Sequence, residues 1–88
     1  MQIKPGLYQH FKGNRYKVIG VGFHTENLQE LVAYQGLYHD KEYGEHPIWI
    51  RPVEMFYDHV SRDGYVGPRF QLLSEHGPFV CKDCGKEI

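Results

Sequence analysis

The chain has 88 residues, and 41 % of them are hydrophobic, which is enough for one small domain with a modest core. Ten Lys and Arg residues against 11 Asp and Glu residues give a net charge of −1, and this balance argues against a dedicated duplex-DNA binder. No apolar run approaches the roughly 18 residues of a membrane-spanning helix, and the N-terminus lacks the apolar stretch of a secretory signal. We therefore expect a cytoplasmic protein without a membrane partner.

Gly and Pro residues occur at short intervals, a pattern that favours short strands joined by turns. The predicted strands cover residues 7–11, 16–23, 31–34 with a continuation to 38, 48–51 and 69–73. In the second of them Gly20 and Gly22 share one face, which indicates a β-bulge or a place where another backbone passes closely.

The connecting segments complete the predicted fold. Residues 12–15 form a hairpin turn, 39–47 a charged loop, 53–59 a helical turn and 62–64 another turn. Five strands and one helical turn predict a mainly β protein, either a small five-stranded SH3-like barrel or a strongly bent antiparallel sheet. We expect this domain to cover residues 1–74, with residues 75–88 as a linker and a C-terminal tail.

Several short sequence blocks follow one another in a recognisable order. They are KPGLY, HFKGN and YKV near the N-terminus, then HTE, LVAY and LY, then WIRP and EMF, and finally PRF. Over about residues 4–73 this order resembles the bacterial family catalogued as domain of unknown function 1653. The resemblance implies a small β-domain, alone or attached to other domains, and it implies no established activity.

The tail carries both cysteines in the pattern Cys81-Lys82-Asp83-Cys84-Gly85, which is typical of a zinc knuckle. A structural zinc site needs four ligands, so we expect His76, five residues before Cys81, as a third. The fourth ligand is open among His59, His39, Asp83 and the Cys pair of a second chain. In the last case, two chains would form a four-thiolate site and a homodimer. The alternatives are a tail with two reduced thiols and, less favoured, a thiol–disulfide redox role.

One polar turn carries the only acid–base pair that the sequence suggests. His24 and Glu26 would place an imidazole beside a carboxylate on a connector, as general catalysis requires. The alternative is a turn whose side chains bond their own backbone.

The aromatic content is 15 %, including seven Tyr residues, and it suits both half-buried strands and a recognition surface. The candidate ligand-binding residues are Tyr8, His10, Tyr34, Trp49, Arg51 and Arg69. They would bind a peptide, a nucleic-acid segment or a small anionic ligand, with the arginines in bidentate contacts. The alternative places Trp49, Phe56 and Phe70 in the core and pairs the arginines with Glu54 or Asp58.

Three functions follow from these patterns. The first is a non-enzymatic binding module that uses the aromatic and arginine residues. The second is a structural protein joined into dimers by zinc at the tail, and the third is a small enzyme that uses His24 and Glu26.

Overall fold

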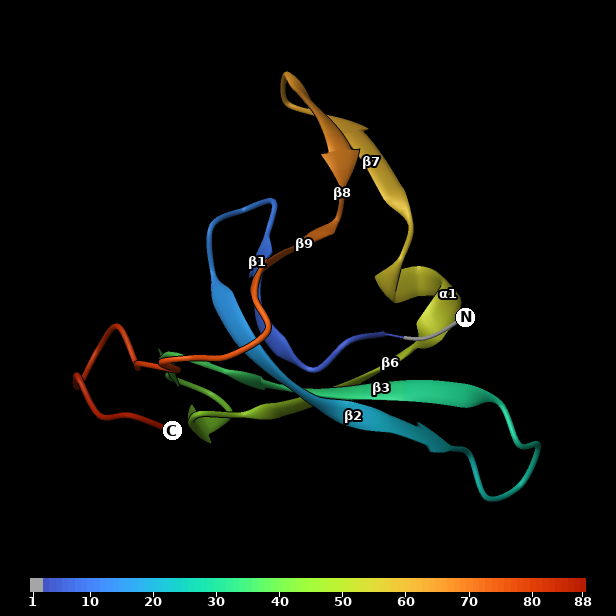
Figure 1. Ribbon diagram of the computed structural model, residues 1–88, viewed down its shortest axis with the longest axis horizontal. Helices are drawn as coiled ribbons and strands as arrows, with labels where there is room; N and C mark the ends of the chain where they lie inside the picture. The colour runs from blue at the N-terminus through green and yellow to red at the C-terminus, as the bar shows by residue number, and fades with distance from the viewer. Residues whose placement is uncertain (1–2) are drawn as a thin grey trace.

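The computed structural model of the protein describes residues 3–88. Short antiparallel strands and one short helix make up the fold (Figure 1). In chain order the elements are β1 (Gly6–His10), β2 (Arg15–Phe23), β3 (Glu30–Gly36), β4 (His39–Asp40), β5 (Gly44–Glu45), β6 (Ile48–Pro52), α1 (Val53–Phe56), β7 (His59–Arg62), β8 (Tyr65–Pro68) and β9 (Phe70–Ser74).

One five-stranded antiparallel sheet, in the order β6-β3-β2-β1-β9, forms the body of the protein. Two smaller hairpins, β4–β5 and β7–β8, are separate from it, and the second projects outward (Figure 1). The prediction of a mainly β protein is confirmed, and the five predicted strands correspond to the five strands of the sheet. No closed barrel is formed by residues 3–88, so the SH3-like barrel is not confirmed. Both small hairpins lie where only a loop or a turn was predicted.

The predicted helical turn is α1, which starts directly after Pro52 and has four residues. No helix in the described part of the chain has the length and apolar character needed to cross a membrane.

A bulge interrupts β2 at the position that its glycines indicated. The pairing of β2 with β3 shifts between Val18, opposite Tyr34, and Gly20, opposite Ala33. A Cβ atom placed on Gly20 or Gly22 would meet no atom within 4 Å. Of the two expectations for these glycines the bulge is confirmed, and a closely passing backbone is not their reason.

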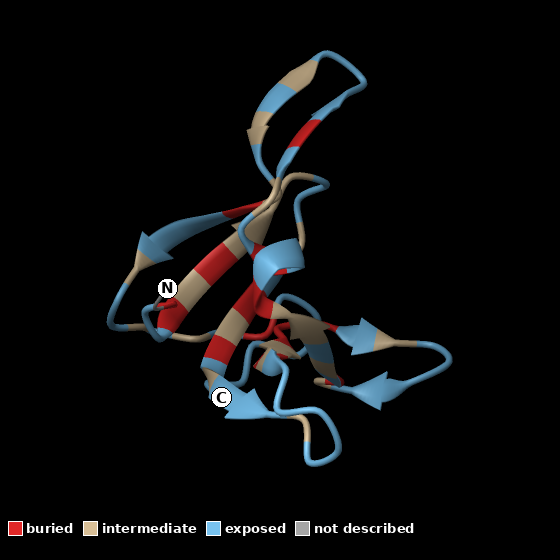
Figure 2. Cartoon of the chain, turned by 90° about the vertical axis from the view of Figure 1, so that its right-hand side faces the viewer, coloured by how far each residue is buried: buried red, intermediate tan, exposed pale blue. Residues whose placement is uncertain are grey.

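The core is built largely from aromatic side chains. The ring of Phe56 on α1 stacks on that of Phe70 on β9, with centroids 4.2 Å apart and planes 7° from parallel. Tyr8, Tyr16 and Tyr34 add edge-on contacts to this pair. Figure 2 shows the buried residues on the sheet and beneath α1, while the projecting hairpin is mostly exposed. The buried cluster consists of Ile3, Tyr8, Tyr16, Val18, Val32, Tyr34, Tyr38, Val53, Phe56 and Phe70.

We predict that Phe56→Ala destabilises the protein by roughly 3–5 kcal/mol, because it leaves a cavity where the helix meets the sheet. The matched control is Phe23→Ala, whose side chain is 64 % exposed on β2 and whose loss should cost less than about 1 kcal/mol. Urea unfolding followed by circular dichroism measures both values. Equal costs for the two substitutions would contradict a core centred on the Phe56–Phe70 stack.

Candidate metal centre

The C-terminal segment lies against the sheet and is held there by hydrogen bonds. The backbone N–H of Lys82 donates to the carbonyl of Leu37 over 3.0 Å, and the Lys82 ammonium donates to Asn14 Oδ1 over 3.1 Å. The carboxylate of Asp83 accepts a 2.7 Å hydrogen bond from the backbone N–H of His39. These contacts place the Cys-x-x-Cys motif beside the β4–β5 hairpin.

Residues 81–86 form a tight turn around the sulfur atom of Cys81. The N–H of Gly85 donates to the carbonyl of Cys81, and the N–H of Cys81 donates to the carbonyl of Lys86. Gly85 has a φ of +75°, a left-handed conformation that glycine adopts without steric cost. The turn therefore needs glycine directly after the second cysteine.

The environment of Cys81 favours its thiolate. The residue is 1 % exposed, and burial alone would raise the pKa of its thiol. Hydrogen bonds from the backbone N–H groups of Cys84 and Asp83, and one from the Cys84 side chain, outweigh that effect and lower the pKa. Hydrogen bonds of this kind stabilise a negatively charged sulfur, which is the form that binds metal.

The β4–β5 hairpin carries two histidines to the same place. His39 starts β4, and His46 directly follows β5, so the antiparallel pairing brings the centroids of their rings to 5.2 Å from each other. The carboxylate of Asp40 accepts the N–H groups of Glu42 and Tyr43 and shapes the turn. The N–H of His46 donates to the carbonyl of Tyr38, which fixes the returning strand.

Four donor groups converge between the hairpin and the tail. One nitrogen each from His39 and His46 and the sulfurs of Cys81 and Cys84 all lie within 4.8 Å of one another. Within this group the Cys84 sulfur is 3.8 Å from Nε2 of His46. Two thiols and two imidazoles are the donor set of many tetrahedral zinc sites.

The four-donor group differs from the predicted ligand set. His39 was one of the open choices for the fourth ligand, and His46 was not considered. His76, the expected third ligand, lies outside the group; its backbone N–H bonds the Ser74 hydroxyl in an exposed turn just after β9. One feature of the sequence could have indicated His46 as a ligand: it lies near the end of the 39–47 segment, and His39 lies at its start. A hairpin in this segment brings the two histidines together.

Tyr8 and Tyr34, expected at a ligand surface, belong instead to the core, where they are 7 % and 5 % exposed. Trp49 packs partly against that core, and its indole N–H donates to the hydroxyl of Tyr38 over 2.9 Å. Phe56 and Phe70 are buried, as the core alternative expected. These rings therefore lie mostly within the core.

Of the other three expected ligand residues, His10 and Arg51 lie at the ring of Phe70, and Arg69 lies at the ring of Phe11. The ring centroids of His10 and Phe70 are 4.9 Å apart, and the Arg51 guanidinium lies 5.5 Å from the Phe70 centroid. Arg69 pairs with Asp58 through two hydrogen bonds of 2.7 and 3.1 Å, as the alternative interpretation expected.

The polar turn at His24 has the backbone-bonded form. The N–H of Glu26 donates to Nδ1 of His24 over 3.0 Å, and the carbonyl of His24 accepts the N–H of Leu28. The imidazole thereby caps its own turn.

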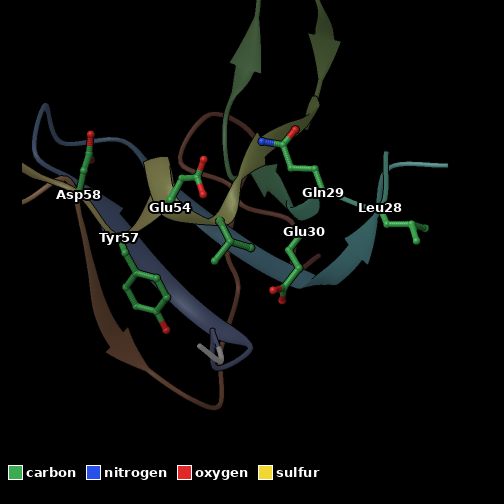
Figure 3. Close-up of a pocket in the computed structure, with 7 residues that line it drawn as sticks. Leu28, Gln29, Glu30, Glu54, Tyr57 and Asp58 are labelled. Atoms are coloured by element: carbon green, nitrogen blue, oxygen red, sulfur yellow. The ribbon is translucent and has the colours of Figure 1, made fainter. Parts of the chain in front are cut away.

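Two open pockets flank α1. The larger, of about 520 Å³, lies between α1 and the start of β3 and carries the carboxylates of Glu30, Glu54 and Asp58 on its lining (Figure 3). The second, of about 400 Å³, is lined by Tyr8, Phe56 and neighbouring residues of β9. Neither includes a residue of the four-donor group.

Comparison with known proteins places this fold in a family. Residues 6–72 match the family described as "protein of unknown function (DUF1653)". The chain belongs to this family. The crystal structure of a DUF1653 protein from Bordetella bronchiseptica superposes with a TM-score of 0.75 at 26 % identity, covering 86 % of this chain and 94 % of that one. No curated protein matches the chain.

The DUF1653 match includes both histidines of the four-donor group and neither cysteine, since it ends at residue 72. The group therefore takes its donors from both the DUF1653 region of this protein and its C-terminal segment.

We predict that the metal-free, reduced DUF1653 protein has one fast and one slow thiol toward a disulfide reagent. Cys84 is exposed and should react first, whereas Cys81, at 1 % exposure, should react slowly because the reagent cannot reach its sulfur. Absorbance-monitored labelling of the native protein tests this. Cys84→Ser should remove the fast phase, and the two thiols should become equivalent in urea; a fast phase that survives Cys84→Ser would contradict the geometry.

Proposed function

We propose that this DUF1653 protein is a small non-enzymatic module that binds one Zn²⁺ ion through His39, His46, Cys81 and Cys84. The ion would fasten the C-terminal segment to the sheet. The observation that carries the proposal is the convergence of four donor groups within 4.8 Å, contributed by two segments that are far apart in the sequence.

The donor spacing suits zinc. Zinc binds thiolate sulfur at about 2.3 Å and imidazole nitrogen at about 2.0 Å, so a tetrahedral ion holds its ligand atoms roughly 3.3–3.8 Å apart. The 3.8 Å separation of the Cys84 sulfur and the His46 nitrogen is close to the value of about 3.5 Å that such an ion gives a sulfur–nitrogen pair. The upper bound of 4.8 Å for the group means that the ion would draw the remaining donors inward slightly.

A site with four protein ligands supports a structural role. Catalytic zinc sites keep a coordination position for water or substrate, whereas structural sites are closed by protein donors. The proposed site is closed within one chain, and this supports a zinc-binding monomer rather than the four-thiolate homodimer. The backbone bond to His24 likewise gives less support to an enzyme that uses His24 and Glu26.

We predict one zinc ion per monomer in protein purified without metal-affinity steps, measured by native mass spectrometry. Cys84→Ser and His46→Ala should each lose the ion, because a closed site cannot spare a ligand. His76→Ala is the matched control and should keep it, since this histidine lies outside the group.

Hydrogen exchange tests the structural part of the proposal on the same samples. Chelation should lower, without abolishing, the protection of the Lys82 amide, which bonds the carbonyl of Leu37, and of the Gly85 amide, which bonds the carbonyl of Cys81. The amides of β2 and β3 should be unaffected. A metal-free protein, a zinc-bearing dimer with four thiolates, or zinc retained by Cys84→Ser would each refute the assignment.

We also predict that zinc affinity falls as the pH is lowered. Both thiols must lose a proton to bind the ion, so protons compete with the metal for the same sulfur atoms. Once both thiols are protonated in the free protein, affinity should fall by about a hundredfold per pH unit. Competition with a chromophoric chelator measures this slope, and an affinity independent of pH would argue against thiolate ligands.

A further inference from the structure

A second group of side chains, unrelated to the metal donors, gathers where β1 ends. Three arginines from separate parts of the chain lie there over two aromatic rings. The guanidinium carbons of Arg62 and Arg69 are 5.7 and 6.0 Å from the centroid of Phe11, and that of Arg51 is 5.5 Å from the centroid of Phe70.

His10 joins the two rings into one row. Its own ring lies 4.6 Å from that of Phe11 and 4.9 Å from that of Phe70, measured between centroids. The ammonium of Lys12 lies 5.9 Å from the Phe11 centroid. We call Arg51, Arg62, Arg69 and Lys12 the basic cluster, because these four cations share the surface of this row.

The basic cluster has little opposing charge. Asp58 pairs with Arg69, and the guanidinium hydrogen bond holds the pKa of that carboxyl below its usual range. Among residues 3–88 no Asp or Glu oxygen lies within 4.0 Å of a nitrogen of Arg51, Arg62 or Lys12. Arg51 uses its Nε to donate to the hydroxyl of Tyr34, a neutral partner. The cluster therefore keeps a surplus of positive charge in a chain whose net charge is −1.

The surplus of positive charge contributes to a lowered pKa of His10. Its pKa is lowered to about 4, first by burial and then by the charges of Arg51, Arg69, Lys12 and Arg62. At neutral pH the imidazole is uncharged. Its Nδ1 accepts the backbone N–H of Lys12 over 3.1 Å, so its proton resides on Nε2, which is a hydrogen-bond donor.

We propose that the basic cluster, with Nε2–H of His10, binds the phosphate group of a small ligand. Guanidinium groups match phosphate oxygens in paired hydrogen bonds, and a doubly charged group matches the surplus of cations better than a single carboxylate does. A bound anion would also relieve the mutual repulsion of cations held close together. The residues expected at an anionic ligand, His10, Arg51 and Arg69, are all part of this arrangement, and Arg62 and Lys12 extend it.

This inference is independent of the zinc proposal. The basic cluster includes a residue of β7, on the projecting hairpin, whereas the C-terminus lies on the opposite side of the body in both Figure 1 and Figure 2. Loss of zinc binding would leave the cluster in place, and loss of anion binding would leave the metal donors in place.

The test is a titration with inorganic phosphate at neutral pH and low ionic strength, followed by two-dimensional NMR. We expect saturable shifts centred on His10 and Phe11, and weaker binding as salt is added. Arg62→Gln should weaken binding by about tenfold, the effect of one charge-assisted hydrogen bond. The matched control is Arg15→Gln, which removes the same charge from β2, where Arg15 bonds Gln9, and should bind as the unmodified protein does.

A second measurement uses the unmodified protein, so that misfolding of a variant cannot affect its result. Saturating phosphate should raise the pKa of His10 from its low value, because a bound anion stabilises the imidazolium. Shifts that never saturate, an unchanged pKa of His10, or equal weakening by Arg15→Gln would overturn the proposal.

The source of the phosphate is resolved by two further probes. Tighter binding of a nucleoside monophosphate than of inorganic phosphate, lost in Arg62→Gln, would support a nucleotide ligand at the cluster. Binding of a short single-stranded oligonucleotide in the absence of any response to inorganic phosphate or monophosphate would overturn the small-ligand proposal in favour of a nucleic-acid surface.

Discussion

The stack of Phe56 on Phe70 is the contact on which most of this small fold depends. A helix of four residues has no stability of its own, because the cost of its first turn is not recovered by later ones. The stack attaches α1 to β9 and so fixes the path of the chain on both sides of the helix. Asp58 follows α1 by two residues, and its carbonyl and carboxylate both bond Arg69, the residue before Phe70. One aromatic contact thus sets the geometry of the basic cluster.

Tyrosine hydroxyls extend the core toward the candidate metal centre. The hydroxyls of Tyr16 and Tyr38 lie 3.3 Å apart, and the indole of Trp49 donates to Tyr38. Burial, and then the hydrogen bond with Tyr38, raises the pKa of Tyr16, so the Tyr16 hydroxyl stays protonated and can act as a donor. Tyr38 also accepts the N–H of His46 with its backbone carbonyl. The hairpin that carries both histidines is therefore attached to a buried tyrosine of the core.

The sheet was predictable because its signals are local. Alternating apolar residues marked its strands, Pro52 marked the end of β6, and two glycines marked the bulge of β2. The hairpins β4–β5 and β7–β8 were missed for a physical reason: β4 and β5 have two residues each, and most of β7 and β8 is exposed. Such segments carry no hydrophobic periodicity to detect.

The two candidate sites were predictable to different degrees. The Cys-x-x-Cys pattern indicated a metal site with His39 among its possible ligands, but the proposed ligand His46 depended on a hairpin that the sequence did not reveal. Tyr8 and Tyr34 were placed at a ligand surface because tyrosine suits both a wet and a buried position. Only the register of the sheet decides whether such a tyrosine is exposed or buried. Tyr8 pairs with Tyr16, and Tyr34 pairs with Val18, on the buried face.

The sheet remains open, and its edge strand β6 has features that limit pairing with another strand. An unpaired edge offers backbone groups to any other extended chain, and Ile48 and Ile50 leave 59 % and 65 % of their surface exposed there. The strand has five residues, Pro47 directly precedes it and Pro52 ends it. Because proline has no N–H to donate, a foreign strand finds only a short stretch to pair with. Replacement of these prolines would lengthen that stretch and make the protein prone to aggregation.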